Sequence, residues 1–397
     1  MHAKLIVARL LEPCLVEMHC KRAAALQRAV LSVVRGAALS LSCIALKMSG
    51  GCKLRHRVKS ADRLLGNCGL REQRVRIYGA LAQWLSGLPQ VLLVVDWSDV
   101  TVDQRWHMLR ASVALRSRSV TLYEEVHPQR LYGNRAVHRK FLKRLAQMLP
   151  AGCMPIVMTD AGFHSTWFEL VAERGWNYVG RIRGTTMVRV GKPGWMRGKW
   201  LYERASAKAL DLGLCACVRS NPTPCRLVLV KEDPQGRHRL NIYGKRRVGR
   251  ASAKCAQAAK EPWLLAASAG LDHLSAQAIT GLYAQRMSIE QSFRDTKNLR
   301  VGQGLEVSRS RHGARLEILL LIAHLAAFVQ RLIGEQAKSQ QLELQFSPTN
   351  RKTRAQISVM SLARRILDAP SHWLQQLTPW SALALLTEQA RAAWASA

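Results

Sequence analysis

The sequence predicts a mixed α/β fold flanked by helical regions. Two apolar runs, PQVLLVVDWSDV (89–100) and PIVMTDAGF (155–163), have the length of buried strands, and each reaches an acid. Segments with a helical period alternate with these runs, which favours a sheet covered by helices. The chain has 397 residues and is 48% hydrophobic, so it can build a large core and two or three domains.

The N-terminal region, residues 1–75, carries apolar residues at three- and four-residue spacing with basic residues between them, which predicts helices. A basic loop is expected before Ser60, which would cap the next helix. The chain has 60 Lys and Arg against 26 Asp and Glu, a formal net charge of +34. Because such an excess favours a polyanionic partner, we expect residues 1–75 to bind DNA rather than form an ordinary helical lobe.

Residues 76–190 predict the first part of the sheet. The helix that follows the second apolar run is expected to begin with Ser165 as N-cap and to end at Gly175. The expected elements are a strand at 89–100, two strands within 106–128 with a turn at RSRS, a helix at 134–149, a strand at 155–163, a helix at 165–175 and a strand-like stretch at 176–190.

Residues 191–262 differ in composition, with Gly, Pro, short strands and a basic loop at 236–254, which predicts a β-rich insertion. Residues 263–335 return to the core with a strand near 262–268, one helix from Ser275 to Asn298 and another at 313–336. Residues 336–397 predict a polar break and two amphipathic helices, which offer either a dimerisation surface or a lid on the core.

Cysteine usage and hydropathy indicate a cytosolic protein. The first twenty residues interrupt their apolar pattern with charges, unlike a secretory signal. The apolar runs 36–46 and 318–329 are shorter than the roughly 20 residues that a membrane helix needs. Ten cysteines without a secretory context suggest reduced thiols. Cys215, Cys217 and Cys225 resemble part of a zinc site without a second matched pair, so thiols in a strand or core are the favoured interpretation.

One predicted helix carries four polar side chains on a single face. On a helix of about 100° per residue, Tyr283, Arg286, Glu290 and Lys297 fall within about 60° of one another, beside an apolar stripe. The cations suit a phosphate backbone. A salt-bridge ladder, with Glu290 paired to Arg286 or Arg294, is the structural alternative.

Asp96 and Asp160 end the two apolar strands. A carboxylate there is costly to bury without a partner, and a divalent cation is one resolution. Together with Glu290 on an adjacent helix, the two aspartates can hold two Mg²⁺ ions for phosphodiester chemistry. Taken singly, a strand-end Asp more often forms a turn or a helix cap. The nearby acids Asp99, Asp103 and Asp295 are competing candidates.

The order Asp96, Asp160, Glu290 on strand, strand and helix resembles the DDE transposases of bacterial insertion sequences, which have a ribonuclease-H-like core. VDWSD and TDAGF resemble the blocks around the first two acids in the cut-and-paste group. Glu290 follows Asp160 by 130 residues, which is too long for a plain ribonuclease-H fold and fits that group's β-strand insertion. The resemblance extends from about Arg57 to the last helices.

The spacing Tyr283-x2-Arg286-x3-Glu290-x6-Lys297 matches the Tyr-Arg-Glu-Lys motif of the same group. The resemblance implies that Tyr283, Arg286 and Lys297 hold phosphates near the cleaved DNA end. The cut-and-paste group is expected to form a DNA hairpin at the cleaved end, and a base flipped out at that step needs a stacking partner. Trp263, just before the motif helix, is our candidate. A core tryptophan under the insertion is the alternative for Trp263.

The resemblance implies a ribonuclease-H-like mixed sheet with a β-rich insertion between helical N- and C-terminal regions. Asp96, Asp160 and Glu290 would be the ligands of two Mg²⁺ ions, for which Mn²⁺ substitutes. Water would cut the transposon end, the new 3′-hydroxyl would form a hairpin on the opposite strand, and the reopened 3′ ends would join target DNA.

The implied partners are double-stranded DNA, as terminal inverted repeats and as target, and a second copy of the chain that forms a homodimer on DNA. The implied location is the bacterial cytoplasm, in association with the nucleoid and not with a membrane. Two alternatives stay open: an inactive, host-retained relative that only binds DNA, and a structure-specific nuclease without strand transfer.

Overall fold

The computed structural model describes residues 3–115, 118–191, 194–231, 249, 261–347 and 357–395. The chain divides into two compact units. The first unit contains Met1–Val91, Val95–Cys153 and Met287–Ala392, and the second contains Leu92–Val94, Met154–Arg286 and Ala393–Ala397. The basic loop predicted at 236–254 lies outside the described residues except for Gly249, as does most of the polar break near 347–353.

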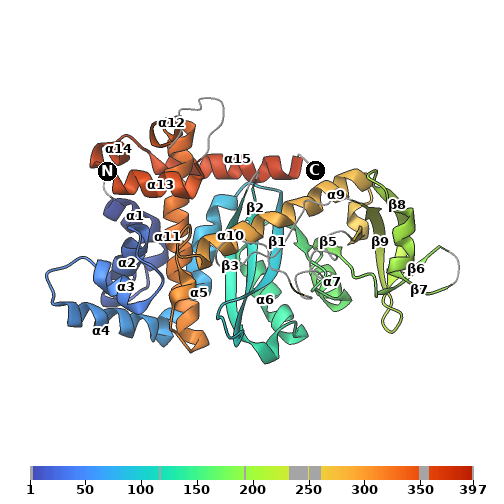
Figure 1. Ribbon diagram of the computed structural model, residues 1–397, viewed down its shortest axis with the longest axis horizontal. Coiled ribbons are helices and arrows are strands. Elements are labelled where there is room, and N and C mark those ends of the chain that lie inside the picture. Colours follow the sequence, from blue (N-terminus) through green and yellow to red (C-terminus); the bar gives the residue numbers. More distant parts are fainter. Residues whose placement is uncertain are drawn as a thin grey trace. The chain divides into compact units, whose positions relative to one another are not determined.

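The first unit is helical at both ends of the sequence, as the apolar periodicity predicts. Its helices α1 to α5 precede the strands β1 to β3, and helices α10 to α15 follow from the C-terminal part of the chain (Figure 1). The elements are α1 (Ala3–Leu15), α2 (Cys20–Val34), α3 (Leu41–Lys47), α4 (Leu54–Leu65), α5 (Cys68–Leu81), β1 (Gln90–Asp99), β2 (Trp106–Ala114), β3 (Ser119–Pro128), α6 (Arg135–Met148), α10 (Ser288–Lys297), α11 (Gly313–Ser339), α12 (Glu343–Phe346), α13 (Val359–Asp368), α14 (Ser371–Gln375) and α15 (Ala382–Ala395).

Helix α11 is the centre of the first unit. Its sequence is apolar on all sides, and most of its side chains are buried. It contacts α2, α4 and α5 of the N-terminal region, strand β3 and helix α13 (Figure 1). By length and composition α11 passes the test for a membrane span, but 89% of its most apolar window is buried inside the structure. It is therefore a core helix of this structure.

In the sheet of the first unit the strand order is β3-β2-β1. Strands β2 and β3 pair antiparallel with a register shift between Ala111 and Ser112. Nearly every residue of β2 is buried, because both of its faces are covered. Helix α10 contacts β2 and β3, and α11 contacts β3.

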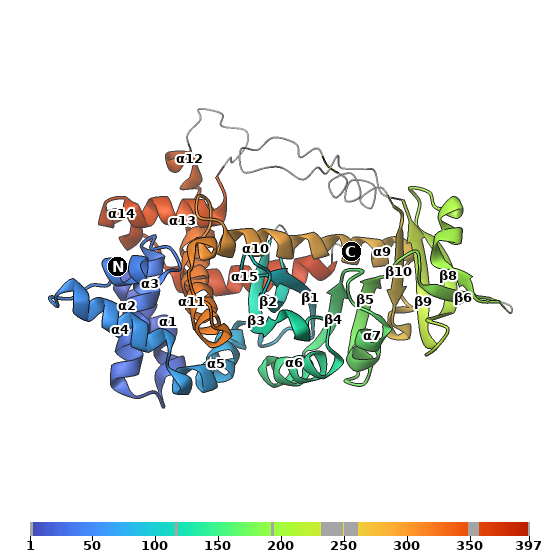
Figure 2. The ribbon, with the colours of Figure 1, turned by 60° about the horizontal axis from the view of Figure 1, so that its bottom comes forward.

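The second unit begins with a βαβ motif and continues as an antiparallel sheet. Strand β4 (Met154–Thr159) is parallel to β5 (Asn177–Arg181), and α7 (Ser165–Ala172) connects them and contacts β5 (Figure 2). The order then runs β5-β10-β9-β8-β6-β7. The remaining elements are β6 (Met187–Val190), β7 (Met196–Arg197), β8 (Leu210–Cys217), β9 (Thr223–Val230), β10 (Trp263–Ala267) and α9 (Ala276–Ala284). Strands β7, β8 and β9 lie within residues 191–262, where short strands were expected, and β6 comes just before this range.

Three local predictions are wrong. Ser60 lies inside α4, whose N-cap is Lys53, because the helix continues back through the basic segment expected to be a loop. Ser165 is the first helical residue of α7, and His164 is the N-cap. Gly175 does follow α7 with φ +70, a conformation that suits glycine at a helix end. The C-terminal region forms α13, α14 and α15 instead of two helices.

The motif helix expected from Ser275 to Asn298 is interrupted. Ser275 caps α9, as predicted, but residues Gln285–Met287 form a 3₁₀ turn before α10. A 3₁₀ turn advances about 120° per residue instead of about 100°. Three such residues rotate Tyr283 about 60° away from its expected position relative to Glu290, so the four motif residues do not share one regular helical face.

Candidate active site

Asp96 lies where the buried part of β1 stops. Residues 91–95 are buried, and Asp96 is the first half-exposed residue after them. Its Oδ1 accepts a hydrogen bond from the N–H of Trp97 at 2.8 Å. The Trp97 ring is buried and donates from Nε1 to Nε2 of His138 at 3.2 Å. Because successive strand residues face opposite sides, Trp97 anchors the strand while Asp96 stays accessible.

Glu290 lies in the first turn of α10 and is exposed. Two contacts attach this helix to the sheet, one at Ser119, the first residue of β3, and one at Arg118, just before β3. The hydroxyl of Ser119 donates to the carbonyl of Ser288 at 3.3 Å, and Arg118 forms an ion pair with Asp295. The first turn of the helix, which carries the exposed Glu290, is thus held at the sheet.

Lys297, in the last turn of α10, reaches the strand that carries Asp96. Its Nζ donates to Oγ of Ser98 at 2.6 Å, two residues beyond Asp96. Burial lowers the pKa of Lys297 to about 8, although the carboxylates of Asp99 and Asp96 act to raise it. The structure therefore joins the last turn of α10 to the strand of the first acid, and Ser98 is a partner that the sequence motif does not indicate.

Asp160 directly follows β4 in the second unit and is half-exposed. Its Oδ1 accepts a hydrogen bond from the N–H of Gly162 at 2.8 Å. A Cβ at position 162 would lie 2.9 Å from that oxygen, so the turn suits glycine. Arg183 holds the same turn from outside, because its Nε donates to the carbonyl of Ala161 at 2.9 Å. The turn fixes the carboxylate at the end of the strand.

Trp263, Tyr283 and Arg286 form an aromatic cluster in the second unit. The rings of Trp263 and Tyr283 meet edge to face with centroids 5.0 Å apart, and the guanidinium carbon of Arg286 lies 6.0 Å from the Tyr283 centroid. Tyr283 is only 4% exposed, whereas Trp263 and Arg286 are half-buried. Tyr283 therefore supports the indole and the guanidinium from within the unit.

The competing acids each pair with a basic side chain in the first unit. The pairs are Asp99 with Nδ1 of His107 at 3.0 Å, Asp103 with Nε of Arg105 at 3.1 Å, and Asp295 with Arg118.

The residues expected to bind metal are divided between the units. Asp96 and Glu290 belong to the first unit and Asp160 to the second. Within the described part of the chain, no three His, Cys, Asp or Glu side chains are gathered into a ready-made group of metal ligands. The expected donors are carboxylate oxygens only, which is the chemistry that Mg²⁺ prefers.

The three cysteines considered for zinc lie on the adjacent strands β8 and β9 and are buried. The Sγ atoms of Cys217 and Cys225 are 3.2 Å apart. Burial raises the pKa of Cys215 to about 11, so its thiol stays protonated at neutral pH. Because the thiolate is the form that binds metal, the geometry favours core thiols.

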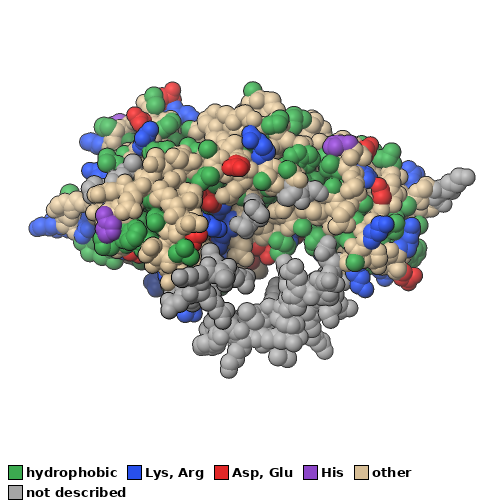
Figure 3. Space-filling view, turned by 90° about the horizontal axis from the view of Figure 1, so that it is seen from above, with side chains coloured by type: hydrophobic (Ala, Val, Ile, Leu, Met, Phe, Trp, Pro, Cys, Tyr) green, Lys and Arg blue, Asp and Glu red, His purple; other side chains and the backbone are tan. Residues whose placement is uncertain are grey.

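A basic groove lies between α2 and α4 in the N-terminal region. It has a volume of about 660 Å³, and its charged lining is entirely Lys, Arg and His. The charged residues of this α2–α4 groove are His19, Lys21, Arg22, Arg28, His56, Lys59 and Arg63. More generally, Lys and Arg side chains are spread over the face of the molecule seen in Figure 3.

A protein-family model matches the chain, whereas no curated protein does. The family model described as the transposase DDE domain matches residues 87–328, which is more than half of the chain. The match begins just before β1 and ends within α11, so it includes Asp96, Asp160 and Glu290. The chain therefore belongs to the transposase DDE domain family.

Proposed function

We propose that this protein is a DNA transposase that cuts transposon ends and joins their 3′ ends to target DNA. The observation that carries the proposal is the family match over residues 87–328, which contains all three acids of the expected site. Asp96, within β1 where its buried part stops, Asp160, directly after β4, and the exposed Glu290 support it. The motif spacing further supports a cut-and-paste reaction with a hairpin intermediate.

Asp96, Asp160 and Glu290 would hold two divalent cations, with Mg²⁺ as the natural ion and Mn²⁺ as a substitute. Bound there, the cations supply Lewis-acid stabilisation of the oxygens around the reacting phosphorus. The carboxylates are suited to this role because all their donor atoms are hard oxygens. One set of carboxylates can serve every step, since end cutting, hairpin formation and target joining are all displacements at phosphorus.

The DNA end would be held by Arg286 and Lys297 and by the edge-to-face pair of Trp263 and Tyr283. Arg286 offers a planar fork for a phosphate, and Lys297 a point charge beside the strand of Asp96. Trp263, supported by Tyr283, has the half-exposed indole that a flipped base needs. The α2–α4 groove would bind a further part of the DNA.

Two copies of the chain would pair through their C-terminal helices and so hold the two transposon ends together.

The test is cleavage of candidate end DNA by Asp96→Asn, Asp160→Asn and Glu290→Gln. Each change keeps the shape of the side chain and removes its charge, so we expect loss of Mg²⁺-dependent cutting by at least about 10³-fold with end binding largely kept. Asp103→Asn is the matched control, because Asp103 is an exposed acid near β1 whose partner is Arg105.

Full cutting by any one of the three variants would remove that residue from the site. Adding a target plasmid to the same reaction separates the alternatives. A transposase joins the cut ends to the plasmid, whereas a nuclease releases ends that are never joined.

A further inference from the structure

Arg110 is a buried cation in the middle of β2 that the motif does not account for. It is 2% exposed and lies directly across from Glu124 of β3, which is fully buried. Nε and Nη2 of Arg110 bind Oε2 of Glu124 at 2.7 and 2.6 Å. A buried ion pair is an uncertain source of stability, because the cost of removing both charges from water can exceed their attraction. Its other contacts indicate what it does.

The outer side of the Arg110 guanidinium binds helix α10. Nη1 donates to Oγ of Ser292 at 2.7 Å, and Nη2 donates to Oγ1 of Thr296 at 3.1 Å. Ser292 and Thr296 are four residues apart, so they lie on one edge of the helix. The guanidinium also lies 5.1 Å from the centroid of the Phe293 ring. One rigid fork thus joins the sheet to the helix that carries Glu290.

The opposite edge of α10 is held separately. On a regular helix, Glu290 and Lys297 lie within about 20° of each other and about 100–160° from Ser292 and Thr296. Lys297 is bonded to Ser98 on β1. Contacts on two separate edges prevent α10 from rolling about its axis, and rolling is the motion that would displace the Glu290 carboxylate most.

Packing alone does not immobilise the Arg110 edge. A cavity of about 50 Å³ lies beside it, lined by Arg110, Ser292 and Thr296 and by His324 and Arg331 of α11. A void provides no contacts that resist movement of the helix into it. The hydrogen bonds of Arg110 therefore contribute to the constraint at this edge, together with the ion pair between Arg118 and Asp295.

Glu124 is held in turn by α5. The hydroxyl of Tyr78 donates to Oε1 of Glu124 at 3.2 Å, and Nη2 of Arg74 donates to the Glu124 carbonyl at 2.6 Å. Arg74 also pairs with Glu317 of α11 at 2.8 Å. The Arg110 fork thus rests on a residue whose carboxylate and carbonyl are both bound by α5.

We propose that Arg110 is a positioning residue for the reaction, which sets the rotation of α10 and thereby the placement of Glu290. The proposal rests on the proposed function, because Glu290 matters only if it is a metal ligand. A ligand must be held within about 0.5 Å of its productive position to be effective. Arg110 itself is buried between the sheet and the helix, so its effect on the reaction would pass through Glu290.

The test changes the helix side of the contact, because removing Arg110 would strand the buried charge of Glu124. Ser292→Ala with Thr296→Val removes both hydroxyls and keeps the buried ion pair. We expect single-turnover cutting at saturating end DNA to fall about 10- to 100-fold, and half-saturation to need more Mg²⁺. End binding should change less than about threefold, since both hydroxyls are engaged by Arg110 within the protein. Ser292→Ala with Thr296→Ser should recover much of the rate, because one hydroxyl returns.

Backbone amide exchange in the absence of DNA and metal gives a second, independent measure. The double variant should exchange faster in residues 288–297 and normally in α11, since only α10 has lost an attachment. Gln291→Ala, at an exposed position of the same helix, is the matched control and should behave like the parent protein. Unchanged exchange in α10, or an unchanged cutting rate and Mg²⁺ requirement, would overturn the proposal.

Failure of the positioning role and failure of the proposed function give different results. If the parent protein does not cut end DNA at all, the proposed function fails, while the exchange measurement still tests the attachment of α10. If the parent protein cuts and the double variant cuts equally well, only the positioning role fails.

Discussion

Trp263 is both partly exposed and held by a neighbouring ring. It starts β10 at a half-exposed position, and its ring is supported edge to face by Tyr283 at 5.0 Å. A fixed indole that keeps part of its surface open can receive a base, since stacking needs a rigid flat partner. A tryptophan that only fills the core would be fully buried, as Trp167 is.

We predict that Trp263→Ala lowers hairpin yield about 10-fold or more and leaves first-strand nicking within about threefold. One base stacked on an aromatic ring contributes about 1–3 kcal/mol, and only the hairpin step requires a flipped base. The measurement is nicked and hairpin product from one labelled end DNA. Trp200→Ala is the control, because Trp200 is a 60% exposed tryptophan of the same unit. Equal loss of both products would argue against stacking.

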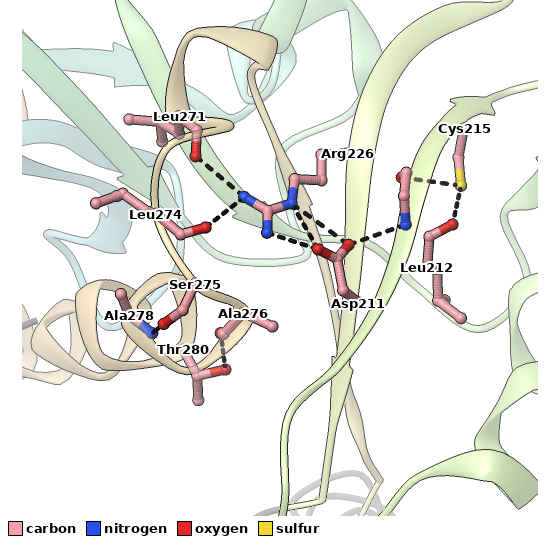
Figure 4. A network of polar contacts seen from close by, with 11 residues as sticks. Asp211, Leu212, Cys215, Arg226, Leu271, Leu274, Ser275, Ala276, Ala278 and Thr280 are labelled. Carbon is pink, nitrogen blue, oxygen red and sulfur yellow. Dashed lines mark hydrogen bonds and ion pairs between the residues drawn. The ribbon is translucent and has the colours of Figure 1, made fainter.

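Among the elements, the β8–β9 hairpin supports the start of the motif helix. Arg226 of β9 is 7% exposed, and its Nη1 donates to the carbonyls of Leu271 and Leu274 at 3.0 and 2.7 Å (Figure 4). Its Nη2 and Nε bind Oδ2 of Asp211 at 2.6 and 3.1 Å. Ser275, which caps α9, follows directly after these carbonyls. The insertion thus sets where α9 begins, and α9 carries Tyr283.

We predict that Arg226→Met lowers the free energy of unfolding by about 2–4 kcal/mol, because two carbonyls lose their donor and a carboxylate loses its partner. Asp211→Asn should cost only about 1 kcal/mol or less, since the Asp211 side chain is 42% exposed and remains solvated. Urea unfolding of both variants provides the comparison. A cost for Asp211→Asn as large as that for Arg226→Met would show that the ion pair, and not the carbonyl contacts, stabilises this junction.

For the whole molecule, the charge of +34 sets how DNA is bound. Each phosphate neutralised releases counterions, so affinity falls with salt in proportion to the number of contacts. The α2–α4 groove concentrates Lys and Arg without an acid in its lining. It is therefore where we expect a large share of the salt dependence to arise.

We predict that Lys59→Gln with Arg63→Gln weakens end binding and makes the plot of log affinity against log salt shallower by about 2, near 0.9 for each lost phosphate contact. Stability should be unchanged, because both side chains are exposed. Arg204→Gln with Lys208→Gln is a control with the same change in charge at exposed positions of the second unit. If the control flattens the plot equally, general charge and not the groove governs binding.

The sequence by itself determined most of the order of strands and helices, the position of Asp160 directly after β4, the Ser275 cap and the short strands within residues 191–262. These features depend on local patterns: apolar runs form buried strands, and caps and glycines mark helix ends within a few residues. Asp96 was expected to end its strand, but β1 continues to Asp99 because the pairing of the strand extends beyond its apolar run. Local signals failed where neighbours decide the outcome, as at Ser60 and in the 3₁₀ turn within the motif helix.

Only the tertiary structure decided how α10 is held. Arg110 lies 14 residues from Glu124 and more than 180 from Ser292 and Thr296, so no periodicity connects them. The bond from Lys297 to Ser98 spans 199 residues. A buried polar contact depends on which side chains the folded chain brings within about 3 Å, and a linear pattern contains no such information. The sequence named the acids, and the packing of the sheet against α10 determines how firmly Glu290 is held.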